Sequence, residues 1–387
     1  MVDHSKLVNL CIICSAALSY ILTMVIIPKS VTIPIVVVIA LLIGMSWYLK
    51  FYRRPLINVL PFIKAFGPFY LWIVLSVFWT VNSDYSFALI RALLGFEFAC
   101  LIGMLTTKES SLKYALIGFI IGGLLSSAVV LYNQYMFIGK MRLGHYIYGS
   151  AMEFSGGLTF SAYSCLVLYR QEKKIAYVIL FWGFIALCAL SGSRTAIIFP
   201  IVFFILLDFF YNQNIYKTIK IAISAIFIIG TLFFTCINVP VFYKVVGYRL
   251  ETILEDKTED GSYMERNEMK EYGLKLWMEK PFVGWGIHGF AKKYQSVNKY
   301  VYSHCDYVEL LSCFGIIGFS LFYFPYLSIL SKRNLYIKAR QNYWYSFFIA
   351  FLFLNIIQSG ASIHFLNMRT MMVLSVICNR ALVVQNA

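Results

Sequence analysis

The chain has 387 residues, of which 60% are hydrophobic and only 13% are charged, and its mean hydropathy is +0.74. About a quarter of the residues in a soluble domain are charged, so this composition excludes an ordinary soluble protein. The net charge is +15, and such a basic excess is also typical of proteins that bind nucleic acids. The distribution of the basic residues along the chain favours a different explanation.

Apolar runs long enough to cross a bilayer, which takes about 20 residues, recur along the whole chain. They predict an all-α polytopic membrane protein with twelve transmembrane helices. The first run has one basic residue before it and no small-residue cleavage site after it, so we expect a retained helix and not a signal peptide. The predicted spans are residues 7–27, 31–49, 59–80, 87–106, 112–137, 151–169, 175–191, 195–211, 218–238, 304–330, 343–359 and 361–380.

The basic residues alternate with the spans. Sixteen of the 33 Lys and Arg residues lie at the N-terminus, at every second connection and near the C-terminus. This is the positive-inside pattern, so we expect both termini in the cytoplasm. The charge therefore reports membrane topology, and no nucleic-acid partner is expected. These residues are Lys6, Lys50, Arg53, Arg54, Lys108, Lys113, Arg170, Lys173, Lys174, Lys217, Lys220, Lys332, Arg333, Lys338, Arg340 and Arg380.

One connection, residues 239–303, is much longer than the others and lies on the outer face by this alternation. Its ten Lys/Arg and nine Asp/Glu nearly cancel, so it is not a polybasic lipid-binding segment. We therefore divide the chain into nine transmembrane helices in residues 1–238, this extracytoplasmic loop, and three transmembrane helices with a short cytoplasmic tail in residues 304–387.

Within the loop, Ser262 and Glu265 have the spacing of a capping box, which predicts a helix that runs to about Lys280. Pro281 prevents its continuation. At 100° per residue this helix has one apolar and one charged face, and Arg266 lies on the flank of the apolar face. The apolar face holds Met269, Tyr272, Gly273, Leu276 and Trp277, and the charged face holds Glu268, Glu271, Lys275 and Glu279.

A polar turn, Ser191-Gly-Ser-Arg-Thr195, joins two spans on the outer face. The helix that begins near Thr195 offers N–H groups and the positive end of its dipole, which attract phosphate. Arg194 adds a guanidinium that can bind phosphate through two parallel hydrogen bonds. An interfacial arginine can equally reach toward lipid headgroups, so the sequence leaves both roles open.

His304 opens the tenth span, and an imidazole there can accept a hydroxyl proton near neutral pH. A structural role is the alternative, since neither Asp306 nor Glu309 lies one helical turn away to orient the ring. Arg369 lies in the middle of the last predicted span, where an arginine costs at least about 2.5 kcal/mol unless it faces protein or water. We expect Arg369 either to pair with Glu97 or Glu309 or to contact lipid phosphate.

The segment Gly284-Trp-Gly-Ile-His-Gly289 has the G-x-G-x-x-G spacing of dinucleotide-binding loops. That fingerprint needs a preceding strand, whereas here a predicted helix precedes it within an outer loop. We interpret the glycines as a sharp turn that returns the loop to the membrane. No cluster of His, Asp and Glu with metal-ligand spacing appears in the loop, so we expect neither a metal nor a cofactor.

Four motifs occur in an order that resembles the O-antigen ligase/polymerase superfamily, over roughly residues 185–330. The resemblance implies a GT-C-like membrane glycosyltransferase of the bacterial inner membrane. Its implied donor is an undecaprenyl-pyrophosphate-linked glycan, used without a metal. The motifs are Ser191-Gly-Ser-Arg-Thr-Ala196, Asp260-Gly-Ser-Tyr-Met-Glu-Arg266, Lys280-Pro-Phe-Val-Gly-Trp-Gly286, and His304 followed by Glu309-Leu-Leu and Gly315-Ile-Ile-Gly318.

By this resemblance Arg194 and Arg266 hold the pyrophosphate, and His304 is the base that activates the acceptor hydroxyl. The residue after the histidine is often Asn in the family and is Cys305 here, which puts a role for that neighbour in doubt. Guanidinium groups can stabilise the charge of a pyrophosphate leaving group, and one base then suffices for an inverting displacement. The candidate pyrophosphate ligands are Arg194, Arg249, Arg266 and Arg369.

The primary hypothesis is a polymerase of O-antigen or capsular polysaccharide, which transfers the growing chain to the terminal sugar of another lipid-linked repeat unit. Two features resemble polymerases and favour this hypothesis over an O-antigen ligase, whose acceptor is lipid A–core. They are the outer loop, which is short as in polymerases although it is the longest connection of this chain, and the compact run 304–318. A flippase for the same lipid is the third hypothesis, although charges along a central cavity are then expected. The expected partners are the lipid-linked oligosaccharide, the bilayer, and the flippase and chain-length regulator of the same pathway.

Overall fold

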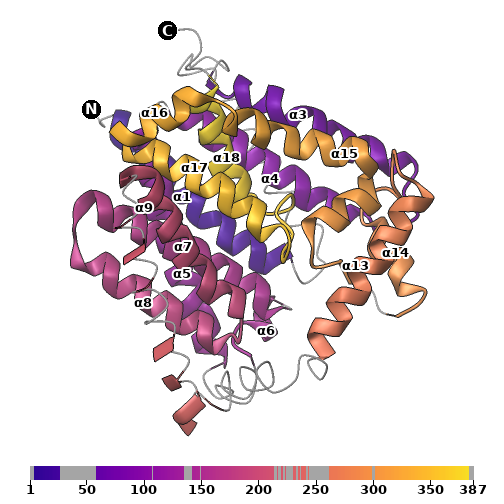
Figure 1. Cartoon of the computed structure of the whole chain (residues 1–387), viewed down its shortest axis with the longest axis horizontal. Coiled ribbons are helices and arrows are strands. Elements are labelled where there is room, and N and C mark those ends of the chain that lie inside the picture. The colour runs from indigo at the N-terminus through magenta and orange to yellow at the C-terminus, as the bar shows by residue number, and fades with distance from the viewer. Residues whose placement is uncertain are drawn as a thin grey trace. The chain divides into compact units, whose positions relative to one another are not determined.

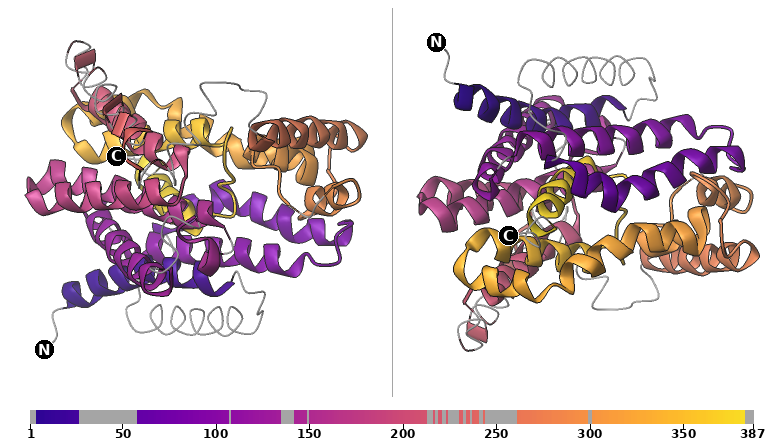
Figure 2. Two further views of the ribbon diagram at one scale, coloured as in Figure 1. Left: turned by 90° about the horizontal axis from the view of Figure 1, so that it is seen from below. Right: turned by 90° about the horizontal axis from the view of Figure 1, so that it is seen from above.

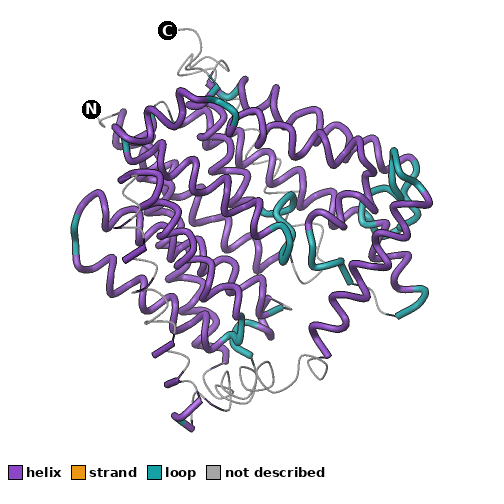
Figure 3. Tube along the Cα trace, in the orientation of Figure 1, coloured by secondary structure: helices purple, strands orange, loops and turns teal. Residues whose placement is uncertain are grey.

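The computed structural model describes residues 4–26, 58–106, 108–134, 142–148, 150–212, 261–298 and 301–382, with scattered positions between 216 and 243. In these residues every regular element is a helix (Figure 3). The elements, labelled in Figure 1, are α1 (His4–Ile26), α3 (Leu60–Leu75), η2 (Ser76–Phe78), α4 (Ser86–Leu105), η3 (Glu109–Ser111), α5 (Leu112–Gln134), α6 (His145–Tyr148), α7 (Ala151–Glu172), α8 (Ile175–Leu190), α9 (Arg194–Asn212), α13 (Gly261–Glu279), α14 (Gly289–Gln295), α15 (Asp306–Leu330), α16 (Arg333–Gln341), α17 (Tyr343–Gln358) and α18 (Met368–Ala381).

The helices are those of a membrane protein. Five are long and apolar enough to span a bilayer, namely Leu60–Phe78, Ser86–Leu105, Leu112–Gln134, Arg194–Asn212 and Asp306–Leu330. Three shorter apolar helices are Val8–Thr23, Ile175–Leu190 and Tyr343–Gln358. The predicted all-α membrane class is therefore confirmed. The predicted spans 31–49 and, for the most part, 218–238 lie outside the described residues, so the count of twelve stays a prediction.

The chain divides into two compact units, each assembled from segments far apart in the sequence. Unit 1 consists of Met1–Pro28, Ser110–Gly261 and Asn334–Leu354, and unit 2 of Lys29–Glu109, Ser262–Arg333 and Asn355–Ala387. The predicted division at residues 239 and 304 follows membrane topology and not packing, and it stays a prediction.

In unit 1, glycines let α1 and α5 approach closely. A Cβ on Gly118 would lie 2.6 Å from the Cβ of Ala16, and one on Gly122 would lie 2.5 Å from the ring of Tyr20. The hydroxyl of Tyr20 donates to the carbonyl of Gly157 on α7 at 2.9 Å. In a bilayer the hydrophobic effect does not drive helices together. Close packing and hydrogen bonds of this kind hold them together instead.

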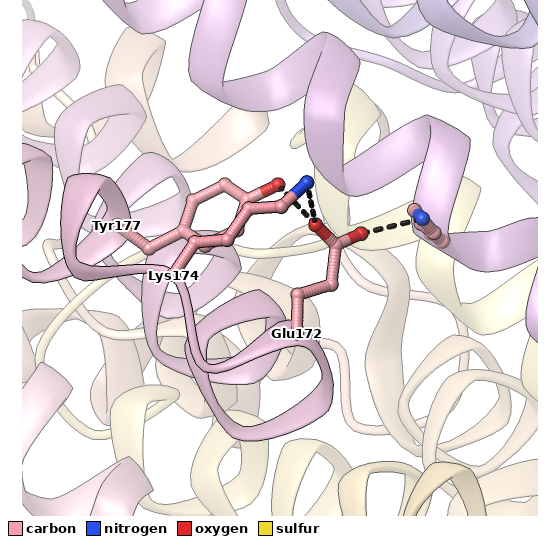
Figure 4. Close-up of polar contacts among 4 residues, drawn as sticks. Glu172, Lys174 and Tyr177 are labelled. Carbon is pink, nitrogen blue, oxygen red and sulfur yellow. Dashed lines mark hydrogen bonds and ion pairs between the residues drawn. The ribbon is translucent and has the colours of Figure 1, made fainter.

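Glu172, at the end of α7, gathers charged groups from neighbouring helices (Figure 4). It pairs with Lys113 of α5, with Lys174 at 2.8 Å, and accepts the hydroxyl of Tyr177 at 3.2 Å. The hydrogen bonds from the two lysines lower the pKa of the Glu172 carboxyl to about 2. The helix ends that the alternation of basic residues places on one side are thus neighbours in unit 1.

In unit 2, α4 and α18 run parallel to each other. Gly95 of α4 lies against Met368 at the start of α18, and Gly103 lies against Ser375 and Asn379 two to three turns later. The amide of Asn379 donates to the carbonyl of Gly103 at 3.2 Å. The start of α18 is therefore fixed at the level of the middle of α4.

An aromatic core joins α3 to α15, which run side by side in unit 2 (Figure 2). The rings of Phe69 and Phe322 have centroids 5.0 Å apart, and Phe66 meets Tyr326 edge-on at 5.9 Å. All four side chains are at most 1% exposed. These aromatic residues pack the interior of unit 2.

Candidate active site

His304 occupies a turn directly before α15, whose N-cap is Cys305. Its φ of +56° lies in the left-handed region, which few residues other than glycine adopt. The imidazole lies against the ring of Tyr302, with centroids 4.3 Å apart, and is partly exposed. A backbone of this kind costs about 1–3 kcal/mol and is common at functional sites. His304 thus has the strained, accessible position that a catalytic group often occupies.

The two carboxylates in the first turn of α15 fix the backbone around this histidine. Glu309 is buried and accepts the N–H of Ser303, the residue before His304, at 2.8 Å. Asp306 is buried and accepts the N–H of His364 at 3.2 Å. The sequence indicated no carboxylate that would orient the ring of His304. In the structure both carboxylates accept main-chain N–H groups.

The predicted loop helix is present as α13 and lies beside the start of α15 (Figure 1). Gly273 permits this contact, because any Cβ there would overlap the side chain of Val308. Met269 and Leu276 are buried beside it, whereas Glu268, Glu271, Lys275 and Glu279 are exposed. The two predicted faces are therefore confirmed. Arg266 is partly buried and precedes Gly273 by two turns on the same face.

Helix α13 packs against the start of α15, close in the chain to His304. The contact is that of Gly273 with the side chain of Val308, and Arg266 precedes Gly273 by two helical turns. Unit 2 therefore holds the helix that carries Arg266 against the helix that follows His304.

A short segment, residues 280–286, closes a break in α15, and we call it the clip. The break lies at Gly315, where φ is +65° and ψ is −171°. The carbonyls of residues 312 and 313 accept the N–H groups of residues 285 and 286 at 2.9 and 2.8 Å. The N–H groups of residues 316 and 317 donate to the carbonyls of residues 281 and 282 at 2.8 and 3.3 Å. The clip thus pairs main-chain groups that a broken membrane helix would leave unsatisfied.

The clip explains the glycines of the G-x-G-x-x-G spacing. Gly284 has a φ of +66°, and a Cβ on it would lie 2.6 Å from the backbone nitrogen of Phe314. Gly286 has a φ of +80°, and a Cβ on it would lie 2.8 Å from the carbonyl oxygen of Ser76. Both glycines serve turns and close backbone approach, as predicted, and no strand precedes them in the described residues.

The helix predicted over residues 361–380 is shorter than expected, because residues 361–367 are not helical. Helix α18 begins at Met368, so Arg369 is its second residue. The side chain of Asn367 caps the helix by accepting the N–H groups of Arg369 and Thr370 at 3.1 and 3.3 Å. Arg369 is 3% exposed, and the start of α18 lies at the level of the middle of α4, a candidate membrane span. Of its two expected partners, Glu309 accepts the N–H of residue 303.

Arg194 belongs to unit 1 and is the first residue of α9, as the sequence predicted to within one residue. Arg142, which the sequence did not single out, fixes the turn before it. Its Nε donates to the carbonyl of Ser191 at 2.9 Å, and its Nη2 donates to that of Gly192 at 3.3 Å. No side-chain pattern announces such a contact, because both acceptors are main-chain carbonyls.

His288 and Arg91 form a second pair that the sequence did not indicate. Burial, and then the charge of Arg91 on α4, lower the pKa of His288 to about 4. His288 is the N-cap of α14 and has a φ of +59°. Arg91 thus lies close enough to this loop for its charge to act on the imidazole.

Unit 2 thus holds three of the candidate residues, Arg266, His304 and Arg369. Arg194 is in unit 1, and Arg249 lies outside the described residues. A base beside guanidinium groups can deprotonate a hydroxyl and stabilise an anionic leaving group. Within the described ranges no three His, Cys, Asp or Glu side chains gather as metal ligands, so we assign none.

Residues 179–323 match the family model described as O-antigen ligase. The matched segment starts within α8 and ends within α15. It contains Arg194, Arg266, the clip and His304, whereas Arg369 lies beyond it. No curated protein matches the chain significantly.

Proposed function

We propose that the protein is a polymerase of bacterial surface polysaccharide. The match over residues 179–323 supports the O-antigen ligase/polymerase superfamily. The protein transfers an undecaprenyl-pyrophosphate-linked glycan to the terminal sugar hydroxyl of another lipid-linked repeat unit. The reaction takes place at the outer face of the cytoplasmic membrane, with both termini in the cytoplasm. The family itself implies a glycosyltransferase-like enzyme that acts on lipid-linked glycans in the bilayer. The acceptor, the orientation and the course of the reaction are our proposal.

In the proposed reaction His304 takes the proton of the acceptor hydroxyl. The acceptor oxygen forms a bond to the anomeric carbon of the donor, and the bond from that carbon to the pyrophosphate oxygen breaks. The electron pair leaves with undecaprenyl pyrophosphate, and the anomeric configuration inverts. Arg194 and Arg266 stabilise the negative charge of the leaving group, with Arg249 and Arg369 as further ligands. No metal is required.

One observation carries this proposal within unit 2. The helix with Arg266 packs through Gly273 against Val308, near the start of the helix that follows His304, although 38 positions separate Arg266 and His304 in the sequence. A base and a phosphate-binding cation must both reach the reacting anomeric centre, so their proximity is what the reaction needs. The flippase and the chain-length regulator of the same pathway are the proposed protein partners.

An O-antigen ligase is the second candidate, because the matched family model bears that description. Its donor is the same, and its acceptor is a sugar of lipid A–core. The polymerase is favoured by the outer loop and the compact run 304–318, both of which resemble those of polymerases. Since either acceptor presents a sugar hydroxyl, His304 could serve both reactions.

Reconstitution tests the proposal. The purified protein in liposomes, supplied with lipid-linked repeat units and excess EDTA, should produce a ladder of longer glycans on the lipid carrier. His304→Ala in the same liposomes should extend the glycans about 10²–10⁴-fold more slowly. Transfer only to added lipid A–core would identify a ligase, and activity that returns only with Mg²⁺ or Mn²⁺ would refute the metal-free mechanism.

A further inference from the structure

Asp306, the first residue of α15, is completely buried and holds a loop in place. Its Oδ1 accepts the N–H of His364 at 3.2 Å. Its Oδ2 accepts the hydroxyls of Tyr323 and Ser359, at 3.2 and 3.4 Å. Its own N–H donates to the carbonyl of Ser359 at 2.7 Å. Asp306 therefore fastens the loop between α17 and α18, residues 359–367, to the start of α15.

This loop leads directly to Arg369. The N–H of Asn367 donates to the carbonyl of His364 at 2.8 Å, and the side chain of Asn367 caps α18 on the N–H of Arg369. A chain of hydrogen bonds thus runs from Asp306 through His364 and Asn367 to the main chain of Arg369. The loop therefore contributes to the position of Arg369, together with the contact of Met368 with Gly95 of α4.

On its other side Asp306 adjoins the histidine turn. His304 precedes it by two residues, and the hydroxyl of Ser303 donates to the carbonyl of Cys305 at 2.9 Å. The N-cap of α15 is Cys305 and not Asp306, and the carboxylate oxygens of Asp306 bond to residues 323, 359 and 364. Burying a carboxylate is costly unless its oxygens are hydrogen-bonded. Helix capping therefore does not explain an aspartate at this position.

We propose that Asp306 is a positioning residue for glycosyl transfer, which sets the imidazole of His304 relative to the guanidinium of Arg369. It touches no substrate and acts through the main chain of the two segments that it joins. The assignment rests on the proposed function for the roles of His304 and Arg369. It goes beyond that function because it names what holds these two groups in register.

A double-mutant cycle tests this. Asp306→Asn keeps the size of the side chain but presents an NH₂ group where the carboxylate accepts. It should lower kcat about 10- to 100-fold, the loss expected from a small misplacement, and leave the KM for the lipid-linked donor nearly unchanged. In a His304→Ala background the same change should have no further effect, since no base is left to position. Losses that multiply in the double variant would overturn the proposal.

If Asp306→Asn does not accumulate in the membrane, two milder variants test the same proposal. Ser359→Ala and Tyr323→Phe each remove one donor to the carboxylate. Each should lower kcat by a smaller factor that disappears in the His304→Ala background, and a factor that persists there would also overturn the proposal. The failure of the proposed function looks different, because His304→Ala alone would then keep the rate of the unmodified protein.

Discussion

Gly315 of α15 lies directly against Phe282 of the clip, so closely that any Cβ on Gly315 would overlap the Phe282 carbonyl. The clip connects α13 to the loop that leads into α14. This contact therefore ties the helix that carries Arg266 to the helix that begins beside His304. The two motifs of residues 280–286 and 315–318 are parts of one structural device, a broken membrane helix completed by a distant segment.

Gly315→Ala should destabilise the protein and abolish glycan extension. The backbone at Gly315 is one that only glycine adopts readily, which alone costs about 1–3 kcal/mol for another residue, and the methyl group would displace the clip. Thermal unfolding of the purified protein and the polymerisation assay measure the two effects. Gly183→Ala in α8, where nothing lies within 4 Å of the added atom, is the matched control. Unchanged stability of Gly315→Ala would show that the clip is dispensable.

His304→Ala and Arg266→Ala should each remove activity while the protein still accumulates in the membrane. Loss of a general base lowers rates by about 10²–10⁴-fold, and loss of Arg266 removes a cation from the leaving group. Lys275→Ala, on the exposed face of the same helix α13, should extend glycans at the rate of the unmodified protein. Chain lengths on gels and immunoblots of membrane fractions give the two readouts. Normal chain lengths with His304→Ala would return His304 to a structural role.

His288 should make stability depend on pH. Its folded-state pKa is about 4, against an ordinary value of 6.5, so between these values the unfolded chain binds a proton that the folded protein excludes. The free energy of unfolding should therefore fall as the pH falls from about 6.5 to about 4. His288→Asn, which tolerates the left-handed backbone, should flatten this dependence when melting temperatures are compared across the window. Equal slopes for the two proteins would contradict the assignment.

Local patterns predicted local structure well. The apolar face of α13 follows from a 100° repeat within one helix, and the start of α9 follows from a polar turn between two apolar runs. The start of α18 at Met368 was not predicted, because hydropathy averages over residues 361–367 as if they were helical. The cap that starts α18 is a single side chain, Asn367, whose role depends on the backbone around it.

The clip and the Arg142 contact had no comparable sequence signal. Both depend on main-chain groups, which every residue carries, meeting segments far away in the sequence. Only the glycines hinted at the clip, and the same spacing also occurs in nucleotide-binding loops. The role of Asp306 was equally hidden, because its partners in residues 359–364 follow it by more than 50 positions.

The membrane orientation can be tested with single cysteines in a background without the native ones. Lys275→Cys on α13 and Arg340→Cys on α16 both place the thiol at an exposed position. The alternation of basic residues predicts that a membrane-impermeant maleimide labels residue 275 in intact cells and residue 340 only after permeabilisation. The reverse pattern would place every candidate residue of α13 and the histidine turn on the cytoplasmic side and refute the proposed site.

Deletion of the gene separates the polymerase from the ligase. A polymerase joins repeat units before a ligase moves them to the cell-surface acceptor, so its loss leaves a working ligase that still attaches single units. In a Gram-negative host the lipopolysaccharide should then collapse from a ladder to core plus one repeat. Loss of a ligase would instead leave bare core, with long chains stranded on undecaprenyl pyrophosphate. The difference lies in the acceptor, a sugar of a lipid-linked repeat or a sugar of lipid A–core, and His304 could activate the hydroxyl of either. We expect core plus one repeat on gels of the deletion strain, restored to a ladder by the unmodified gene and not by His304→Ala; bare core would identify the ligase.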